Sequence, residues 1–247
     1  MIVAAALPGL PEVRRDDDLA ALLLAASDRL ADGDVLVVAH KVVSKAEGRV
    51  VALAAVEPGE RARALADEHG KDPRVVEVIL GESTEIVRSR PGVLICRTRH
   101  GFVCANAGVD ASNAGAAGEL VLLPRDPDAS ARALRRRLGE LGGVAPAVVV
   151  TDSFGRAWRV GQCDVAIGAA GLAPVDDWRG RRDAGGRELA ATIVAVADEA
   201  AAAADLARTK DGREPAVLVR GLERHVTRAD GPGAAALVRA RSEDLFL

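Results

Sequence analysis

The chain carries at residues 147–162 the segment Ala147-Val-Val-Val-Thr-Asp-Ser-Phe-Gly-Arg-Ala-Trp-Arg-Val-Gly-Gln162, in which a strand-like apolar run is followed by polar and charged side chains. Its first four residues are a short apolar run, typical of a strand buried inside a sheet. Asp152 follows this run after Thr151, and loops held at the ends of strands commonly carry function. The segment therefore predicts a sheet with a functional edge.

A second polar segment, Asn106-Ala-Gly-Val-Asp-Ala-Ser-Asn113, also follows an apolar, strand-like run. Both segments place carboxylate, amide or hydroxyl oxygens next to glycine, and hard divalent cations such as Mg²⁺ and Mn²⁺ prefer oxygen ligands. Asp110 and Asp152, with the neighbouring Ser153, are therefore candidate metal ligands. The alternative for each aspartate is a turn residue that makes an Asx hydrogen bond.

Basic residues follow the second aspartate and the apolar run at residues 35–39, and they are candidates for an anion site. Arg156 and Arg159 follow the second aspartate, where they are candidates to clamp a polyanionic substrate; a solvated basic face is the alternative. Lys41 and Lys45 follow the apolar run at residues 35–39, and a lysine in that position reaches phosphate as a point charge. Surface lysines are the alternative here. Metal and anion sites side by side indicate phosphoryl chemistry.

Composition and motifs exclude several other classes of protein. The net charge is −3 and aromatic residues make up 2% of the 247 residues, which argues against nucleic-acid and anionic-membrane partners. The phosphate-binding motifs GxxxxGK[ST] and GxGxxG do not occur, so a nucleotide would need a different kind of binding site. No uncharged run approaches the roughly 20 residues of a membrane span. Without a basic signal-peptide region or CxxC pair, we expect a cytoplasmic protein with reduced thiols.

Strand and helix patterns alternate along the chain, but they also include a hairpin around His100-Gly101. This mixture predicts an α+β fold with mixed sheets and helices, in one module over residues 1–247 that has two lobes. We expect the first helix to begin at residues 16–18 and stop at Gly33, and a later helix to be capped by Asp128. Arg135 to Arg137 are expected on a solvated helix face, and Trp158 and Trp178 in the core.

Several motifs occur in a fixed order: Gly9-Leu-Pro-Glu12, Asp32-Gly-Asp-Val35, Lys41-Val-Val-Ser-Lys-Ala-Glu-Gly-Arg49, Asn106 to Asn113, Leu123-Pro124 with Asp126-Pro-Asp128, Thr151-Asp-Ser-Phe-Gly-Arg156, Ala166-Ile-Gly-Ala-Ala-Gly171, Ala197-Asp-Glu199 and Val219-Arg-Gly221. In this order they closely resemble the coenzyme F420:L-glutamate ligase family. The resemblance runs from about Leu7 to Leu247, and several long motifs in order are far more specific than one short pattern.

The resemblance implies a GTP-dependent amide ligase that adds L-glutamate to the lactyl carboxylate of F420-0 and releases GDP and phosphate. An acyl phosphate fits this reaction, because a bare carboxylate has no adequate leaving group. The resemblance also implies Mg²⁺ or Mn²⁺ at two sites, K⁺ as a further candidate cation, a homodimer, and a two-lobed α+β fold. In some bacterial relatives a flavin-binding nitroreductase-like domain follows this module; we expect none here.

The resemblance also assigns roles to individual residues. Asp110 and Asp152 become metal ligands, with Ser153 serving a second ion, and with Lys45 they form the expected catalytic set. At position 40 the compared relatives carry serine or cysteine, so the larger ring of His40 alters that nucleotide contact. Residues expected to contact GTP are Leu10, Pro11, Glu12, Val13, His40, Lys45 and Asn113.

Three alternatives stay open from the sequence. The first is a ligase of the same mechanism that acts on a different acid, because substrate pockets change more easily than phosphate sites. The second is a metal-dependent nucleotide phosphohydrolase. The third is a nucleotide-binding protein without catalysis, against which the candidate residues Asp110, Asp152 and Lys45 argue.

Overall fold

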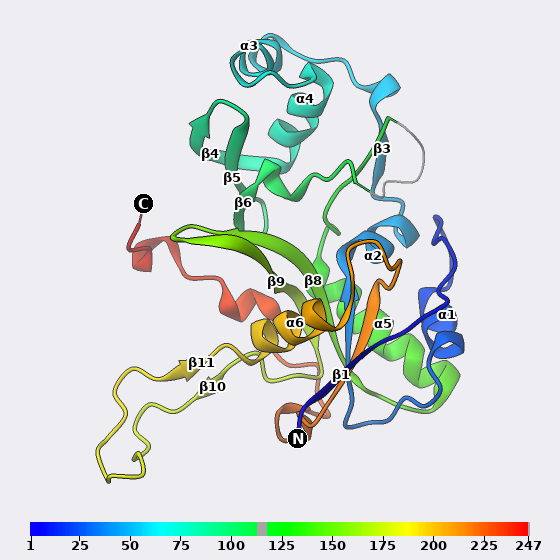
Figure 1. Cartoon of the computed structure of the whole chain (residues 1–247), viewed down its shortest axis with the longest axis vertical. Helices are drawn as coiled ribbons and strands as arrows, with labels where there is room; N and C mark the ends of the chain where they lie inside the picture. Colours follow the sequence, from blue (N-terminus) through cyan, green and yellow to red (C-terminus); the bar gives the residue numbers. More distant parts are fainter. Residues whose placement is uncertain (113–117, 247) are drawn as a thin grey trace.

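The chain folds into two lobes, shown in Figure 1 as a computed structural model that describes residues 1–112 and 118–246. Within these residues, five strands form the main sheet of the lower lobe in the order β1-β12-β2-β8-β9. Only β2 and β8 run parallel, and every other neighbouring pair is antiparallel. The strands are β1 (Val3–Ala6), β12 (Ala216–Arg220), β2 (Val35–Ala39), β8 (Ala147–Arg156) and β9 (Arg159–Ala170).

Helices cover both faces of this sheet. Side chains of a strand alternate between faces, so Leu36 and Val38 pack with α1 (Leu19–Ala26) and α5 (Pro127–Gly142). Val35 and Val37 pack on the opposite face against α6 (Val196–Ala207). These four side chains of β2 are fully buried. The continuous apolar run at residues 35–38 is explained by this burial on two sides.

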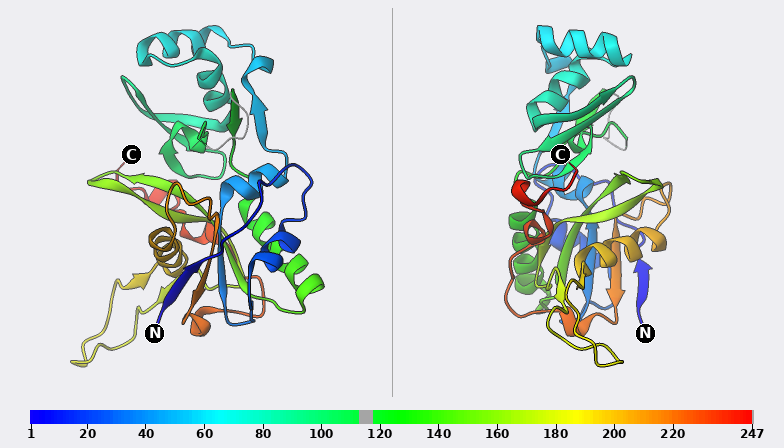
Figure 2. Two further views of the ribbon diagram at one scale, coloured as in Figure 1. Left: turned by 45° about the vertical axis from the view of Figure 1, so that its right-hand side comes forward. Right: turned by 90° about the vertical axis from the view of Figure 1, so that its left-hand side faces the viewer.

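The upper lobe, which stands apart from the main sheet in Figure 2, is formed by the described residues between 50 and 121. It has its own hydrophobic core. It is entered through β3 (Val50–Ala52) and left through β7 (Glu119–Val121), and these two strands pair with each other. A three-stranded antiparallel sheet forms the rest of it with two helices. These elements are β4 (Ser83–Arg90), β5 (Val93–Thr98), β6 (Val103–Ala105), α3 (Glu60–His69) and α4 (Pro73–Glu82).

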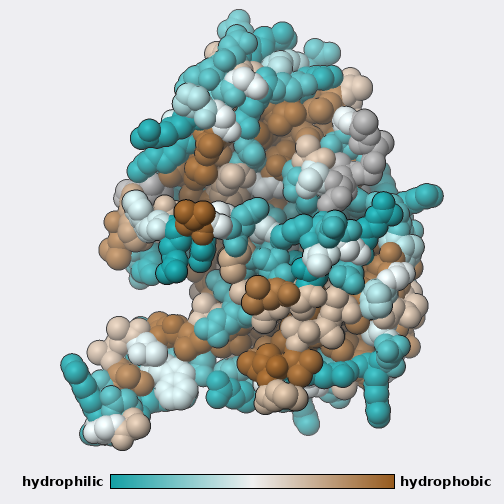
Figure 3. All heavy atoms as spheres, viewed as in Figure 1, coloured by the Kyte–Doolittle hydropathy of each residue, from teal (hydrophilic) through white to brown (hydrophobic). Residues whose placement is uncertain are grey.

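A two-stranded arm projects from the lower lobe (Figures 1 and 3). Its base is formed by the pairing of β10 (Asp176–Asp177) with β11 (Ile193–Val194). Among the described residues, no helix is both long and apolar enough to cross a membrane. The remaining short helices are α2 (His40–Ala46), η1 (Leu53–Ala55), η2 (Asn106–Gly108), η3 (Glu223–His225), η4 (Ala234–Leu237) and η5 (Arg241–Glu243).

The α+β class and the hairpin around His100-Gly101 are confirmed, because β5 and β6 pair there. Two helix boundaries differ from the expectation. Helix α1 ends at Ala26 rather than at Gly33. Helix α5 is capped by Asp126, whose side chain accepts from the Ala129 N–H, while Asp128 lies inside the first turn and is buried.

Three side chains also lie elsewhere than expected. Arg135 is buried rather than solvated, because its guanidinium donates to the carbonyl oxygens of Pro146 and Thr227 and pairs with Asp230. Trp158 is 79% exposed and lies outside the core. Trp178 is half-buried on the arm, where the Arg181 guanidinium lies 4.9 Å from its ring centroid.

The buried thiols give a prediction about reactivity. Cys96 and Cys104 face each other across the β5–β6 pair as free cysteines. Burial raises the pKa of Cys104 to about 12 and also raises that of Cys96. Thiolate is the reactive form, so at pH 8 iodoacetamide should modify partly exposed Cys163 first and leave the buried pair intact. Mass spectrometry should detect three modifications after urea denaturation; native modification of Cys104 as fast as Cys163 contradicts this.

Candidate functional site

A pocket of about 730 Å³ lies where β2, β8, α2 and the loop at residues 208–215 meet. Most of the predicted site residues line it together. The predicted residues in its wall are Leu10, Pro11, Glu12, Val13, His40, Lys45, Asp110, Asp152 and Ser153. Asn113, the remaining residue predicted to contact GTP, lies outside the described residues.

The parallel pairing of β2 with β8 explains why two of these residues lie side by side. Ala39 is the register partner of Thr151, so the next residues, His40 and Asp152, emerge next to each other. The His40 Nε2 atom lies 3.3 Å from Asp152 Oδ1, and the ring is almost completely buried. Asp152 itself is still inside β8, just after a register shift against β9, and not in a loop beyond the strand.

Asp110 reaches the pocket from the upper lobe, where its backbone forms an isolated bridge with Val121. One carboxylate oxygen accepts from the Ser112 N–H at 2.6 Å, which is the Asx hydrogen bond expected of a turn aspartate. The other oxygen accepts from Lys41 Nζ at 2.7 Å. Burial acts to raise the pKa of Asp110, but the Lys41 ammonium and the Ser112 N–H together hold it below its ordinary value. Asp110 is therefore charged at neutral pH.

Lys45 is buried beside the same pocket, and its ammonium forms an ion pair with Glu12 Oε1 at 2.5 Å. Helix α2 carries Lys41 and Lys45 four residues apart, which places both side chains on one helix face. Both therefore line the pocket. The interpretation of these lysines as plain surface residues is wrong.

The pocket wall also contains a buried aspartate that we did not predict from the sequence. Asp164 on β9 lies opposite Ser153 on β8 and is 1% exposed. It accepts from Thr151 Oγ1 at 2.9 Å and from Ser153 Oγ at 2.6 Å, and it pairs with the Arg208 guanidinium. Because the Ser153 hydroxyl donates its proton to Asp164, the oxygen lone pairs of Ser153 are left for another partner.

Lys210 is that partner in this structure, with its Nζ atom 3.1 Å from Ser153 Oγ and 2.7 Å from Asp205 Oδ1. Arg208 and Lys210 follow α6, far from the other site residues in sequence. The signals that could have indicated this group are a carboxylate at the start of the apolar run at residues 165–170 and a basic cluster after an alanine-rich helix.

Arg156 and Arg159 lie at the turn of the β8–β9 hairpin, where they face each other in register. Both are exposed, and Arg156 donates to the Val160 carbonyl oxygen at 2.5 Å. Neither belongs to the described residues that line the pocket. The structure thus does not bring these two arginines to the other predicted residues, and their substrate role stays a prediction.

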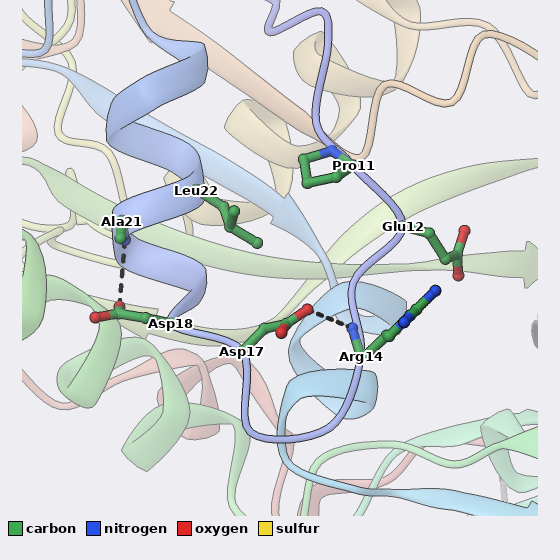
Figure 4. Close-up of a pocket in the computed structure, with 7 residues that line it drawn as sticks. All are labelled: Pro11, Glu12, Arg14, Asp17, Asp18, Ala21 and Leu22. Carbon is green, nitrogen blue, oxygen red and sulfur yellow. Dashed lines mark hydrogen bonds between the residues drawn. The ribbon is translucent and has the colours of Figure 1, made fainter.

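A smaller hollow of about 490 Å³ adjoins the pocket and shares Pro11 and Glu12 with it. Its two aspartates are used in local structure (Figure 4). Asp17 accepts from the Arg14 N–H at 2.7 Å, and Asp18 caps α1 by accepting from the Ala21 N–H at 3.2 Å. Both carboxylates of the hollow are therefore engaged in local hydrogen bonds at the start of α1.

The donor set of the large pocket suits a hard cation. Asp110, Asp152 and Ser153 offer carboxylate and hydroxyl oxygens. In the part of the chain that the structure describes, no group of three or more His, Cys, Asp or Glu side chains is close enough to hold a metal ion alone. Mg²⁺ typically uses one or two carboxylates and takes its other ligands from water and substrate phosphates. The residues present fit a cation that arrives with a nucleotide.

Comparison with known proteins identifies the family. The sequence profile of the F420-0:gamma-glutamyl ligases matches residues 9–221. The chain belongs to this family. The matched residues of this F420-0:gamma-glutamyl ligase chain include the upper lobe, most of the lower lobe and all the described residues that line the large pocket.

Curated relatives agree with this assignment over nearly the whole chain. The coenzyme F420:L-glutamate ligase of Methanopyrus kandleri is 52% identical over 237 residues, covering 95% of this chain and 93% of the relative. That of Methanothermobacter thermautotrophicus is 46% identical over 243 residues, covering 96% of both. That of Archaeoglobus fulgidus is 47% identical and covers 87% of this chain and 85% of the relative.

Proposed function

We propose that this chain is a GTP-dependent ligase that joins L-glutamate to the lactyl carboxylate of F420-0. The observation that carries the proposal is the convergence of Asp110, Asp152, Ser153 and Lys45 in one pocket of a chain that belongs to the F420-0:gamma-glutamyl ligase family. The coarser conclusion, a ligase of F420 biosynthesis, is supported by the names of the relatives. The use of GTP and the chemical route are the finer proposals.

Two group transfers make up the proposed reaction. A carboxylate oxygen of F420-0 attacks the γ-phosphorus of GTP, and the bond from that phosphorus to the β,γ-bridging oxygen breaks, which gives GDP and an acyl phosphate. The glutamate amine then attacks the acyl carbon, and the carbon–oxygen bond to phosphate breaks. The neutral amine gives up one proton and the amide nitrogen keeps the other hydrogen, so the products are an amide, inorganic phosphate and one proton.

The pocket residues stabilise the charge of the first transfer. In this proposal Lys45 contacts phosphate oxygens, and Leu10 to Val13, which line the same pocket, form the wall for the nucleotide. Asp110 and Asp152 would hold a divalent cation, and Ser153 Oγ would serve a second. When bound, Mg²⁺ or Mn²⁺ neutralises charge on the phosphates during transfer. Because such transfers depend on positioning and electrostatics, a preformed charged pocket is the main contribution of the protein.

A mass-resolved ligation assay tests this proposal. Incubation of the protein with GTP, Mn²⁺, L-glutamate and F420-0 should give a product heavier by one glutamate residue, with GDP and phosphate in equal amounts. If the F420-0 carboxylate carries ¹⁸O, one ¹⁸O atom should appear in the released phosphate. Product without ¹⁸O transfer would exclude the acyl phosphate while leaving the ligase in place.

The omission controls separate the alternatives. GTP consumption that needs neither F420-0 nor glutamate indicates a phosphohydrolase. Consumption that needs another acid indicates a ligase with a different acceptor, and GTP binding without turnover indicates a binding protein. A homodimer and a cytoplasmic location stay predictions; light scattering after size-exclusion chromatography measures the first directly.

A further inference from the structure

Four cationic side chains in the described pocket wall are paired with carboxylates. The pairs are Lys41 with Asp110, Lys45 with Glu12, Arg208 with Asp164 and Lys210 with Asp205. One pair differs from the others in what it joins. Lys41 stands one helical turn before the proposed phosphate contact Lys45, and its partner Asp110 is the proposed metal ligand.

The Lys41 ammonium contacts the Asp110 carboxylate oxygen that a bound metal cation would need. Nζ lies 2.7 Å from Asp110 Oδ2 and 2.7 Å from Ser112 Oγ, while Asp110 Oδ1 is engaged by the Ser112 N–H. Oδ2 is thus the oxygen of Asp110 that faces an exchangeable partner. The Lys41 side chain is 24% exposed and that of Asp110 is 35% exposed, so solvent and ligands reach the pair.

The charges of the bound ligands determine when the ion pair between Lys41 and Asp110 can break. A divalent cation on Asp110 with Lys41 still beside it brings charges of +2 and +1 together, and such like charges repel strongly in a partly buried site. A triphosphate changes the balance because it supplies several negative charges within reach of Lys41. The pair is therefore stable in the ligand-free protein and unstable once the cation and the nucleotide are both bound.

We propose that Lys41 exchanges partners during binding and so couples the metal ion to the nucleotide. In the ligand-free protein its ammonium neutralises Asp110. In the loaded protein Asp110 holds the cation, and Lys41 turns to a phosphate oxygen next to Lys45. This inference rests on the proposed function, because it takes Asp110 as a metal ligand and GTP as the nucleotide.

The exchange predicts effects of opposite sign for one substitution. Lys41→Met keeps an unbranched side chain only one atom shorter but removes the charge that competes for Asp110. We expect Mn²⁺ alone to bind the variant about tenfold more tightly than the wild type, and a β,γ-imido GTP analogue with Mn²⁺ to bind about tenfold more weakly, within the usual range of couplings between sites. Electron paramagnetic resonance of free Mn²⁺ and calorimetry of the analogue measure these two affinities without turnover.

Two further variants sharpen the result. Lys71→Met makes the same change of net charge outside the residues that line the pocket, so it should leave both affinities within twofold of wild type. Lys41→Arg keeps the positive charge and should preserve the weak binding of Mn²⁺ alone. Circular dichroism of all variants confirms that they are folded.

The outcomes separate this inference from the proposed function. If the wild type binds Mn²⁺ and the analogue with mutual enhancement but Lys41→Met weakens Mn²⁺ binding or changes it by less than twofold, the exchange is overturned and the ligase proposal stands. If the wild type binds neither ligand, both are overturned. Tighter Mn²⁺ binding together with weaker analogue binding supports the exchange.

Discussion

Replacement of Asp152 by asparagine is expected to lower kcat/KM for ligation by at least about 100-fold, the upper end of what a supporting residue of a metal site costs. Asparagine has the same shape and can still accept the hydrogen bond from the Ser153 N–H, which is 2.8 Å long in the structure. The negative charge beside His40 and facing the pocket is lost. The expected loss therefore comes from chemistry and not from folding.

Steady-state kinetics with GTP, Mn²⁺, glutamate and F420-0 measure this loss, and thermal unfolding should give a melting temperature close to that of wild type. Asp177→Asn is a matched control, because Asp177 is an exposed residue on the arm whose carboxylate pairs with nearby Arg179. It should retain full activity. Unchanged turnover of Asp152→Asn at ordinary metal concentrations would remove Asp152 from the mechanism.

Replacement of Asp128 by alanine should produce the largest loss of stability, about 3 kcal/mol or more in the free energy of unfolding. The Asp128 carboxylate is buried and accepts three backbone N–H bonds, from Ala169, Ala234 and Ala235, at 2.7 to 3.1 Å. These donors lie on β9 and η4, so one side chain ties two distant segments to α5. Each buried donor left without an acceptor costs about 1–3 kcal/mol.

The neighbouring Asp126→Ala change is the internal control. The Asp126 side chain accepts an exposed capping bond from the Ala129 N–H and lies 3.9 Å from the Arg132 guanidinium, an exposed pair that contributes little. The loss of such a cap costs about 1 kcal/mol. Urea titrations of both variants, followed by circular dichroism, measure the difference in midpoint at equal slope. Equal losses for the two aspartates would show that Asp128 contributes no more than a helix cap.

The sequence predicted the parts of the site that lie next to recognisable patterns. The apolar runs at residues 35–39 and 147–150 are followed by His40 and Asp152, and a parallel register of two strands is sufficient to place those side by side. Lys45 follows from helical periodicity after the first run. These features depend on local spacing, which a single sequence displays.

The features that escaped prediction depend on partners far apart in the chain. Asp164 is an ordinary strand residue until it is paired with Arg208, 44 residues later. Asp128 was expected to cap its own helix. Its carboxylate oxygens instead accept hydrogen bonds from backbone N–H groups more than 40 residues away. The link between Lys41 and Asp110 joins residues that are 69 positions apart and belong to different lobes. Tertiary folding creates these contacts, and no local periodicity signals them.

The upper lobe is an insertion into the chain of the lower lobe, and the paired strands β3 and β7 form its neck. Val50 lies opposite Val121, so the chain leaves and re-enters the lower lobe at one hydrogen-bonded place. Asp110 is anchored at that same neck through its backbone bridge to Val121. The outer helices of the insertion can thus vary in sequence and length across a lineage without moving the carboxylate, whereas a single deletion at the neck would shift it relative to Asp152.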